Sequence, residues 1–161
     1  MTPRILWLAA LLLAAAALFG AHPARAASSP WSYCRQTGTD DTLREIPNAL
    51  VPAAVRLFGL SAMPAEQVRR GTYFRCYEGD VFVCNVGANL PCGKADTSRD
   101  LAGADQWCAQ NPSSDFIPMY VTGHDTIYDW RCTGPKATPV KEVFHTDPRG
   151  FVAEMWKEAT P

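Results

Sequence analysis

The fold is decided by residues 72–92, TYFRCYEGDVFVCNVGANLPC. Two runs rich in aromatic and β-branched residues meet at Glu78-Gly79, which is the pattern of two strands joined by a two-residue turn. A cluster of Gly, Asn and Pro follows and ends on Cys92, so the stretch holds three of the six cysteines. It therefore predicts a hairpin that can nucleate an antiparallel sheet and anchor cross-links.

The turn at Glu78-Gly79 also sets the register of the hairpin. The predicted cross-strand pairs are Tyr77 with Asp80, Cys76 with Val81, Phe74 with Val83, and Tyr73 with Cys84. Because side chains alternate along a strand, Phe74, Cys76, Val81 and Val83 fall on one face and Arg75, Phe82 and Cys84 on the other. Cys76 and Cys84 are therefore not expected to bond each other.

The cysteine count predicts disulfides. All six lie after residue 26: Cys34, Cys76, Cys84, Cys92, Cys108 and Cys132. An even number in an exported chain predicts three bridges, and six cysteines allow 15 pairings, among them a loop closed by Cys84 and Cys92. The spacings match no zinc motif, and fully paired cysteines leave no thiolate nucleophile, so we expect neither a metal nor a cofactor.

The first 26 residues have the three parts of a cleavable secretory signal. Arg4 precedes an apolar run of about 16 residues, shorter than the roughly 20 that a membrane-spanning helix needs, and Ala24-Arg25-Ala26 is a small-residue cleavage site. The alternative is an uncleaved membrane anchor. The alanine-rich leader is typical of a bacterial exported protein, so we expect a periplasmic or secreted protein with no membrane span after cleavage.

Residues 27–161 are expected to form a single domain, because a chain of this length can bury about two-thirds of its unfolded surface. Without Arg4 and Arg25 it has 13 basic and 16 acidic residues, a net charge of −3. It contains no run of five like charges, so nucleic acid and anionic membranes are poor partners. An envelope or secreted protein is the expected partner, and the oligomeric state stays open.

Several short segments have helical spacing or helix signals. The pattern predicts a helix over 52–58 that ends at Gly59, a short turn over 65–70, and a helix over 98–110 opened by a capping box at Thr97-x-x-Asp100. Asp40 or Asp41 is expected to cap another short turn.

After Asp115 the apolar period changes from helical to two. Residues 116–122 and 126–132 flank Gly123-His124, a type II′ hairpin signal, and strands at 140–145 and 151–157 flank a type I turn at 147–150. The last segment also has helical spacing. The whole chain predicts an α+β fold with an antiparallel sheet of about five or six strands and two or three short helices against one face, stapled by disulfides.

Two polar loops carry the candidate binding residues: Asn85, Asn89 and Lys94 in the first, and His124 and Asp125 in the second. A phosphate-loop interpretation of the first loop fails. Its glycines are separated by five residues instead of four, and Ala95 stands where a magnesium-binding Ser or Thr is needed.

Both histidines of residues 27–161 lie near a carboxylate at a turn, His124 beside Asp125 and His145 two residues before Asp147. A general base oriented by an acid, or a metal site, needs these residue types close together. Turn geometry alone also favours them. The G-x-S-x-G, H-E-x-x-H and C-x-x-C signatures of common enzymes do not occur.

The sequence therefore favours a non-enzymatic, exported binding or interaction module of the cell envelope, a stapled scaffold that displays polar loops. One alternative is a small extracytoplasmic hydrolase that uses His124 with an acidic partner, and another is a structural subunit of an envelope complex. An acid bonded to His124 inside a pocket would favour the hydrolase, and an exposed His124 without a partner would favour the module. A large exposed apolar patch would favour the subunit.

Overall fold

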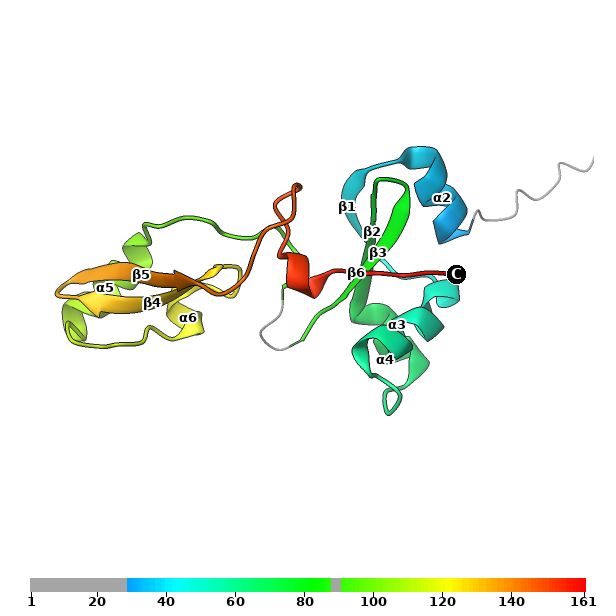
Figure 1. Ribbon diagram of the computed structural model, residues 1–161. Coiled ribbons are helices and arrows are strands. Elements are labelled where there is room, and N and C mark those ends of the chain that lie inside the picture. The colour runs from blue at the N-terminus through cyan, green and yellow to red at the C-terminus, as the bar shows by residue number, and fades with distance from the viewer. Residues whose placement is uncertain (1–28, 88–90) are drawn as a thin grey trace, which may run out of the picture.

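The computed structural model of the protein describes residues 29–87 and 91–161, so the expected secretory signal and Asn89 lie outside the described residues (Figure 1). The elements are α2 (Pro30–Thr37), β1 (Asp40–Glu45), η2 (Asn48–Leu50), α3 (Val51–Phe58), α4 (Ala65–Arg70), β2 (Thr72–Tyr77), β3 (Asp80–Asn85), α5 (Ala102–Gln110), α6 (Met119–Thr122), β4 (Tyr128–Thr133), β5 (Lys136–Glu142), η3 (Ala153–Met155) and β6 (Lys157–Glu158). In the described part of the chain, no helix is both long and apolar enough to cross a membrane.

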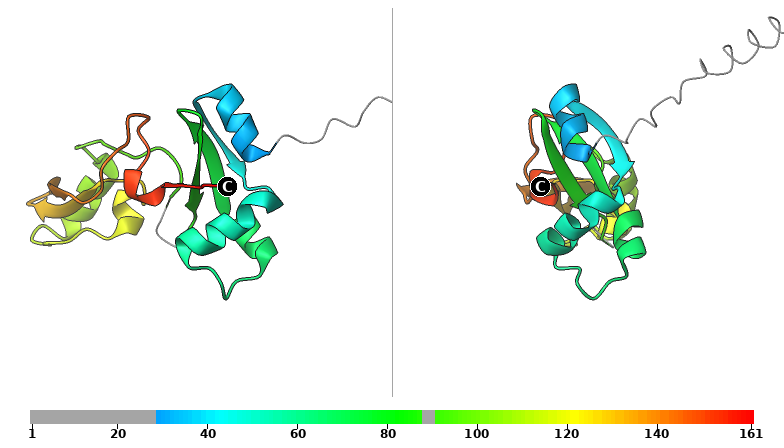
Figure 2. Two further views of the ribbon diagram at one scale, coloured as in Figure 1. Left: turned by 45° about the vertical axis from the view of Figure 1, so that its right-hand side comes forward. Right: turned by 90° about the vertical axis from the view of Figure 1, so that its right-hand side faces the viewer.

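The predicted α+β class is confirmed, and the six strands are divided between two antiparallel sheets. Four of them form a sheet in the order β1-β2-β3-β6, while β4 and β5 form a separate two-stranded sheet. Figures 1 and 2 show the result as two lobes joined by extended connections. The first lobe holds the larger sheet with α2, α3 and α4, and the second holds β4, β5, α5 and α6.

The central hairpin has the predicted register. β2 and β3 pair Tyr77 with Asp80, Cys76 with Val81, Phe74 with Val83, and Tyr73 with Cys84. Glu78 and Gly79 adopt φ values of 53° and 93°, the left-handed backbone that a two-residue turn of this kind requires at both positions. The hairpin occupies the two middle positions of the larger sheet, so every other strand of that sheet is added to its edges.

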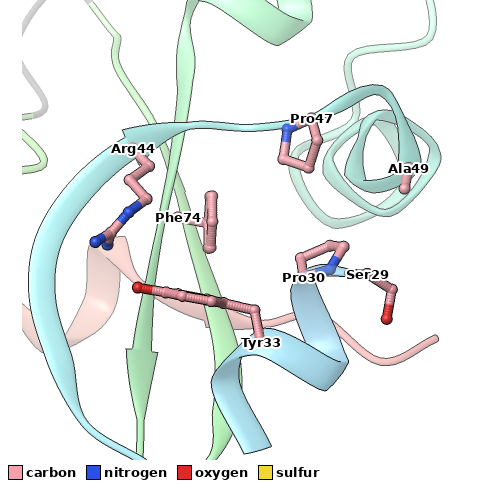
Figure 3. Close-up of a pocket in the computed structure, with 7 residues that line it drawn as sticks. All are labelled: Ser29, Pro30, Tyr33, Arg44, Pro47, Ala49 and Phe74. Atoms are coloured by element: carbon pink, nitrogen blue, oxygen red, sulfur yellow. The ribbon is translucent and has the colours of Figure 1, made fainter. Parts of the chain in front are cut away.

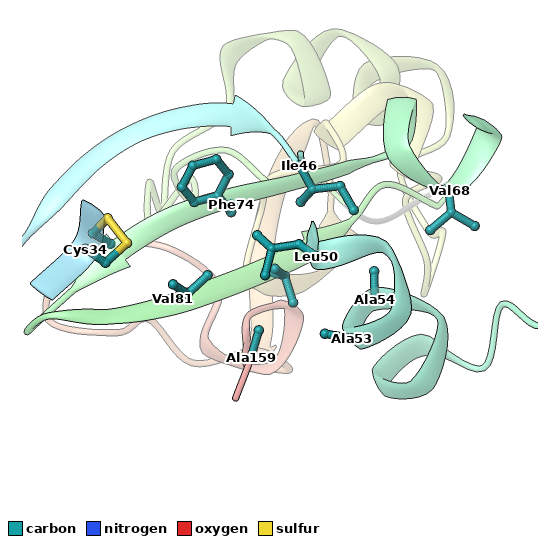
Figure 4. Close-up of a cluster of buried hydrophobic side chains, with 11 residues drawn as sticks. Cys34, Ile46, Leu50, Ala53, Ala54, Val68, Phe74, Val81 and Ala159 are labelled. Atoms are coloured by element: carbon teal, nitrogen blue, oxygen red, sulfur yellow. A yellow bond between two sulfur atoms is a disulfide. The ribbon is translucent and has the colours of Figure 1, made fainter. Parts of the chain in front are cut away.

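The main core lies on the face of this sheet that the helices cover. Phe74, Cys76, Val81 and Val83 point toward the helices, where they pack with buried side chains shown in Figure 4: Cys34, Ile46, Leu50, Ala53, Ala54 and Val68. The helix predicted at 52–58 is confirmed as α3, which begins one residue earlier, and Gly59 ends it with a left-handed φ of 67°. The segment predicted as a short turn at 65–70 forms the helix α4.

Three disulfides are present, as predicted. Cys34–Cys76 ties α2 to β2, Cys84–Cys92 closes the loop after β3, and Cys108–Cys132 ties α5 to β4. The prediction that Cys76 does not bond Cys84 is confirmed, and all six cysteines are paired. Each lobe therefore has a bridge that joins a helix to a strand.

The opposite face of the larger sheet holds a buried arginine. The Arg75 side chain is 1% exposed and forms an ion pair with Asp147. Its guanidinium carbon lies 4.2 Å from the Phe151 ring centroid and 4.8 Å from that of Trp156. The predicted turn at 147–150 is confirmed by a hydrogen bond from the Gly150 N–H to the Asp147 carbonyl oxygen, 2.9 Å long. Arg75 thus fastens the C-terminal segment to the sheet.

The predicted hairpin at Gly123-His124 is wrong. Residues 119–122 form α6 instead of a strand, and β4 pairs with β5 across a turn at Gly134-Pro135. Residues 114–117 do run beside β4, because the Ile117 N–H donates to the Trp130 carbonyl oxygen at 3.0 Å. Pro118 has no N–H to continue this pairing, and proline favours the start of a helix.

Four further boundaries differ from the predictions. The strand predicted at 140–145 lies earlier in the chain, as β5 over Lys136–Glu142. α5 begins at Ala102 instead of Ser98, because the side chains of Asp96 and Ser98 cap a local turn and Leu101 takes the N-cap position. Asp40 begins strand β1 instead of capping a turn, and this strand pairs with β2. The segment at 151–157 contains η3 and the start of β6.

Candidate binding groove

An apolar groove of about 440 Å³ opens on the helix-covered side of the first lobe (Figure 3). It lies between α2 and the chain that leads from β1 into η2, and we call it the α2 groove. The residues that line it are Ser29, Pro30, Tyr33, Arg44, Pro47, Ala49 and Phe74. Its volume falls within the range of about 300–1,000 Å³ that is usual for ligand pockets.

The groove has a buried base and an exposed rim. The Phe74 side chain on β2 is 6% exposed, whereas Pro47 and Ala49 at the rim are exposed. Two prolines fix the backbone on either side: Pro30 begins α2, and Pro47 holds an extended conformation before η2. Ligand binding therefore requires little ordering of the walls.

A charged cluster centred on Asp40 closes one end of the groove. The Tyr33 hydroxyl donates to Asp40 Oδ2 at 2.9 Å, Arg44 Nη2 lies 2.8 Å from the same oxygen, and the Thr42 N–H donates to Oδ1 at 2.9 Å. The hydrogen bond from Thr42, followed by those from Tyr33 and Arg44, holds the pKa of Asp40 well below its usual range. The carboxylate therefore stays charged at neutral pH and keeps Tyr33 in place.

The Cys34–Cys76 disulfide fixes the spacing of Tyr33 and Phe74, the two aromatic side chains of the groove. Cys34 follows Tyr33 in α2, and Cys76 lies two residues after Phe74 on the same face of β2. Both half-cystines are fully buried. The bridge therefore connects the element that carries Tyr33 to the strand that carries Phe74.

Asn85 and Lys94, which the sequence singled out for binding, make contacts within the protein. The Asn85 side-chain amide donates to the Gly71 carbonyl oxygen at 3.0 Å and to Thr72 Oγ1 at 2.8 Å, and Asn85 also lines a cavity of about 240 Å³. Lys94 Nζ donates to Asp41 Oδ2 at 2.8 Å and lies 4.0 Å from the Phe151 ring centroid. Neither residue lines the α2 groove.

His124 and Asp125 are exposed in the loop between α6 and β4. Among residues 29–87 and 91–161, no hydrogen bond or ion pair involves the side chain of either one, although the Asp125 carbonyl oxygen accepts from the Asp96 N–H at 2.7 Å. The same described residues contain no group of three or more His, Cys, Asp and Glu side chains arranged to hold a metal ion.

The second histidine does pair with an acid. His145 Nδ1 lies 2.7 Å from Glu154 Oε1, and the His145 backbone N–H donates to the same carboxylate at 3.1 Å. The hydrogen bond with Glu154, together with the charge of this carboxylate, raises the pKa of His145 above its ordinary value of 6.5. The pair of His145 and Glu154 therefore contributes to the free energy of unfolding. This contribution is fully present below the pKa of His145 in the unfolded chain and is lost as the pH rises through its pKa in the folded protein.

Glu154→Gln is therefore expected to return the pKa of His145 toward 6.5. The loss of stability that the His145–Glu154 pair causes as the pH rises above 6.5 should then disappear. An NMR titration of the imidazole protons, with urea unfolding at several pH values, measures both effects. Glu158→Gln is the matched control and should leave the His145 pKa unchanged. An unchanged pKa in Glu154→Gln would show that the pair does not form in solution.

The sequence could not identify the α2 groove because its residues come from separate segments that only the fold brings together. The one sequence feature that pointed toward the groove was proline at positions 30 and 47, because proline makes the backbone rigid. Comparison with known proteins finds no match to this chain among family models, curated proteins or solved structures.

Proposed function

We propose that the protein is an exported, non-enzymatic binding module that holds an extended, proline-containing segment of a partner protein in the α2 groove. One observation carries this proposal: an apolar groove lined by two aromatic side chains is held in shape by a disulfide and by a half-buried cluster of hydrogen bonds at one end. Three disulfides are typical of proteins that fold outside the cytoplasm. The partner is then an envelope or secreted protein, in the periplasm or the medium of a bacterium.

The chemistry of the groove favours a polyproline II segment. Such segments dock into grooves lined by aromatic side chains, and they lose little conformational entropy because their backbone is already extended. Tyr33 and Phe74 supply the aromatic surfaces, with Pro30 and Pro47 beside them. Arg44 stands at one end, and its five N–H donors exceed the two bonds that it makes to Asp40 and Thr42, so donors remain for a peptide carbonyl oxygen.

The surroundings of His124 support a binding module over a hydrolase. A general base needs an orienting partner and a substrate within hydrogen-bond reach. In the described residues the His124 side chain has no such partner, is exposed, and does not line the α2 groove.

Selection of a random peptide library on the oxidised protein tests the proposal, followed by fluorescence anisotropy with the selected peptide. We expect proline-containing peptides. Tyr33→Ala removes an aromatic wall and should weaken binding by about tenfold or more. Ala49→Lys places a long charged side chain at the exposed rim and should weaken binding to a similar degree.

Ser61→Lys and His124→Ala are the controls, because both positions are exposed and lie outside the groove. Neither change should alter the affinity. Equal affinity of the native protein and Ala49→Lys would contradict binding in the groove, and turnover of a substrate that is lost in His124→Ala would favour the hydrolase.

A further inference from the structure

The second lobe contains a pocket of about 320 Å³ with an aromatic lining, which we call the aromatic pocket. It lies against β4 and the segment around α6, and it is separate from the α2 groove. Four aromatic side chains line it, Phe116, Tyr128, Trp130 and Phe144, together with Met119 and Asp129. Phe116 is 62% exposed and gives the pocket an accessible edge.

Two of the rings form a right-angled corner. The centroids of Tyr128 and Trp130 are 6.2 Å apart, and their planes meet at 89°. Trp130 Nε1 donates to Thr126 Oγ1 at 2.9 Å, which fixes the indole and satisfies its polar edge. Trp130 is only 2% exposed, so the rings that a ligand can reach are those of Tyr128 and Phe116. The faces of aromatic rings carry partial negative charge and attract a cation.

One acidic side chain lies in the lining of the pocket and can balance a bound cation. Of the residues that line it in the described part of the chain, Asp129 alone carries a charge. Two cations of the protein already lie nearby: Lys141 Nζ is 3.5 Å from Asp129 Oδ2, and the Arg99 guanidinium carbon is 4.8 Å from the Tyr128 ring centroid. The Asp129 and Lys141 side chains are 49% and 66% exposed, so this pair is open to competition from a ligand.

We propose that the aromatic pocket binds a small organic cation that carries N-methyl groups, such as a quaternary ammonium group. The methyl groups contact the rings and Met119, the positive charge faces the accessible rings of Tyr128 and Phe116, and Asp129 balances it. An ammonium ion without methyl groups is more strongly hydrated and has less apolar surface to bury, so it gains less from such a site. This site does not depend on peptide binding in the α2 groove.

Choline and its uncharged isostere 3,3-dimethylbutan-1-ol test the proposal, because the two molecules share a shape and differ in charge. Each is titrated into the oxidised protein purified after export, and the indole N–H signal of Trp130 is followed by NMR. We expect saturable binding of choline that is about tenfold tighter than binding of the isostere. The indole signals of Trp31, Trp107 and Trp156 serve as internal controls and should not shift.

Two variants that remove charges of opposite sign provide a second test. Asp129→Asn should weaken choline binding about fivefold, whereas Lys141→Gln removes a competing cation and should strengthen it about twofold to fivefold. Phe116→Ala should weaken binding about fivefold, and Asp115→Asn, which lies outside the pocket, should change nothing. Equal affinities for choline and the isostere, no binding of choline, or no response to Asp129→Asn and Lys141→Gln would each overturn the proposal.

Discussion

Replacing both Cys34 and Cys76 with alanine is expected to lower the free energy of unfolding by about 4 kcal/mol and to abolish peptide binding in the α2 groove. The two cysteines are 42 residues apart, so their bridge greatly restricts the unfolded chain. The same bridge sets the spacing between the helix that carries Tyr33 and the strand that carries Phe74. Urea unfolding and fluorescence anisotropy with a selected peptide measure the two effects.

Removal of the Cys84–Cys92 bridge is the matched control. Its cysteines are only 8 residues apart, so the same relation predicts a loss of about 2.5 kcal/mol. The bridge lies on the other face of the sheet, and we expect groove binding to persist. Unaltered peptide affinity in the Cys34→Ala/Cys76→Ala variant, measured where it is still folded, would contradict a groove held in shape by this disulfide.

Asp147→Asn is expected to destabilise the protein by about 3 kcal/mol, because it removes the nearer of the two carboxylates that pair with the buried Arg75 and leaves only Asp41, 3.9 Å away. The Arg75 and Asp147 side chains are 1% and 13% exposed. Asparagine keeps the side-chain oxygen that accepts the Arg149 and Phe151 N–H groups, so the turn itself is preserved. The C-terminal segment, however, loses its ionic attachment to β2. Urea unfolding monitored by tryptophan fluorescence measures the loss.

The double variant Arg75→Met/Asp147→Asn tests whether this loss arises from the buried charge of Arg75 once its nearer partner is gone. Methionine fills part of the space among the rings of Phe151 and Trp156 without a charge, so we expect the double variant to regain most of the stability. Asp129→Asn removes an acid from an exposed pair and should cost less than about 1 kcal/mol. Equal losses of stability in Asp147→Asn and Asp129→Asn would show that the buried ion pair contributes no more to stability than the exposed one.

The central hairpin could be predicted because its signals are local. Glu78-Gly79 fixes the turn, the turn fixes the register, and alternation then assigns Phe74 and Arg75 to opposite faces. The same alternation excludes a bond between Cys76 and Cys84, which the structure confirms. Short helices next to proline and glycine, such as α3, were predictable for the same reason.

The second lobe shows where local signals fail. Gly123-His124 resembles a hairpin turn, but Pro118 stops the preceding chain from pairing further with β4, and β5 takes the other edge of that strand. Strand β1 was missed because Asp40 and Asp41 suggest a cap. Its pairing with β2 depends on a long-range contact that sequence spacing does not reveal.

The binding residues predicted from the sequence all came from two polar loops. Loops often carry binding residues, and they are easy to recognise in a sequence. The α2 groove instead combines side chains from α2, β1, the chain around η2, and β2. A buried base such as Phe74 has the same sequence pattern as any core residue. Its place at the bottom of a groove depends on how α2 packs, which the sequence does not specify locally.

Site-specific cross-linking in cells tests groove binding most directly. Ala49 is replaced with the photoreactive residue p-benzoylphenylalanine, and the same replacement at Ser61 provides the control, because both positions are exposed and only Ala49 lines the groove. We predict a discrete adduct with one partner protein from position 49, formed through an extended proline-containing segment, and none from position 61. No adduct at position 49, or the same adducts from both positions, would contradict the account.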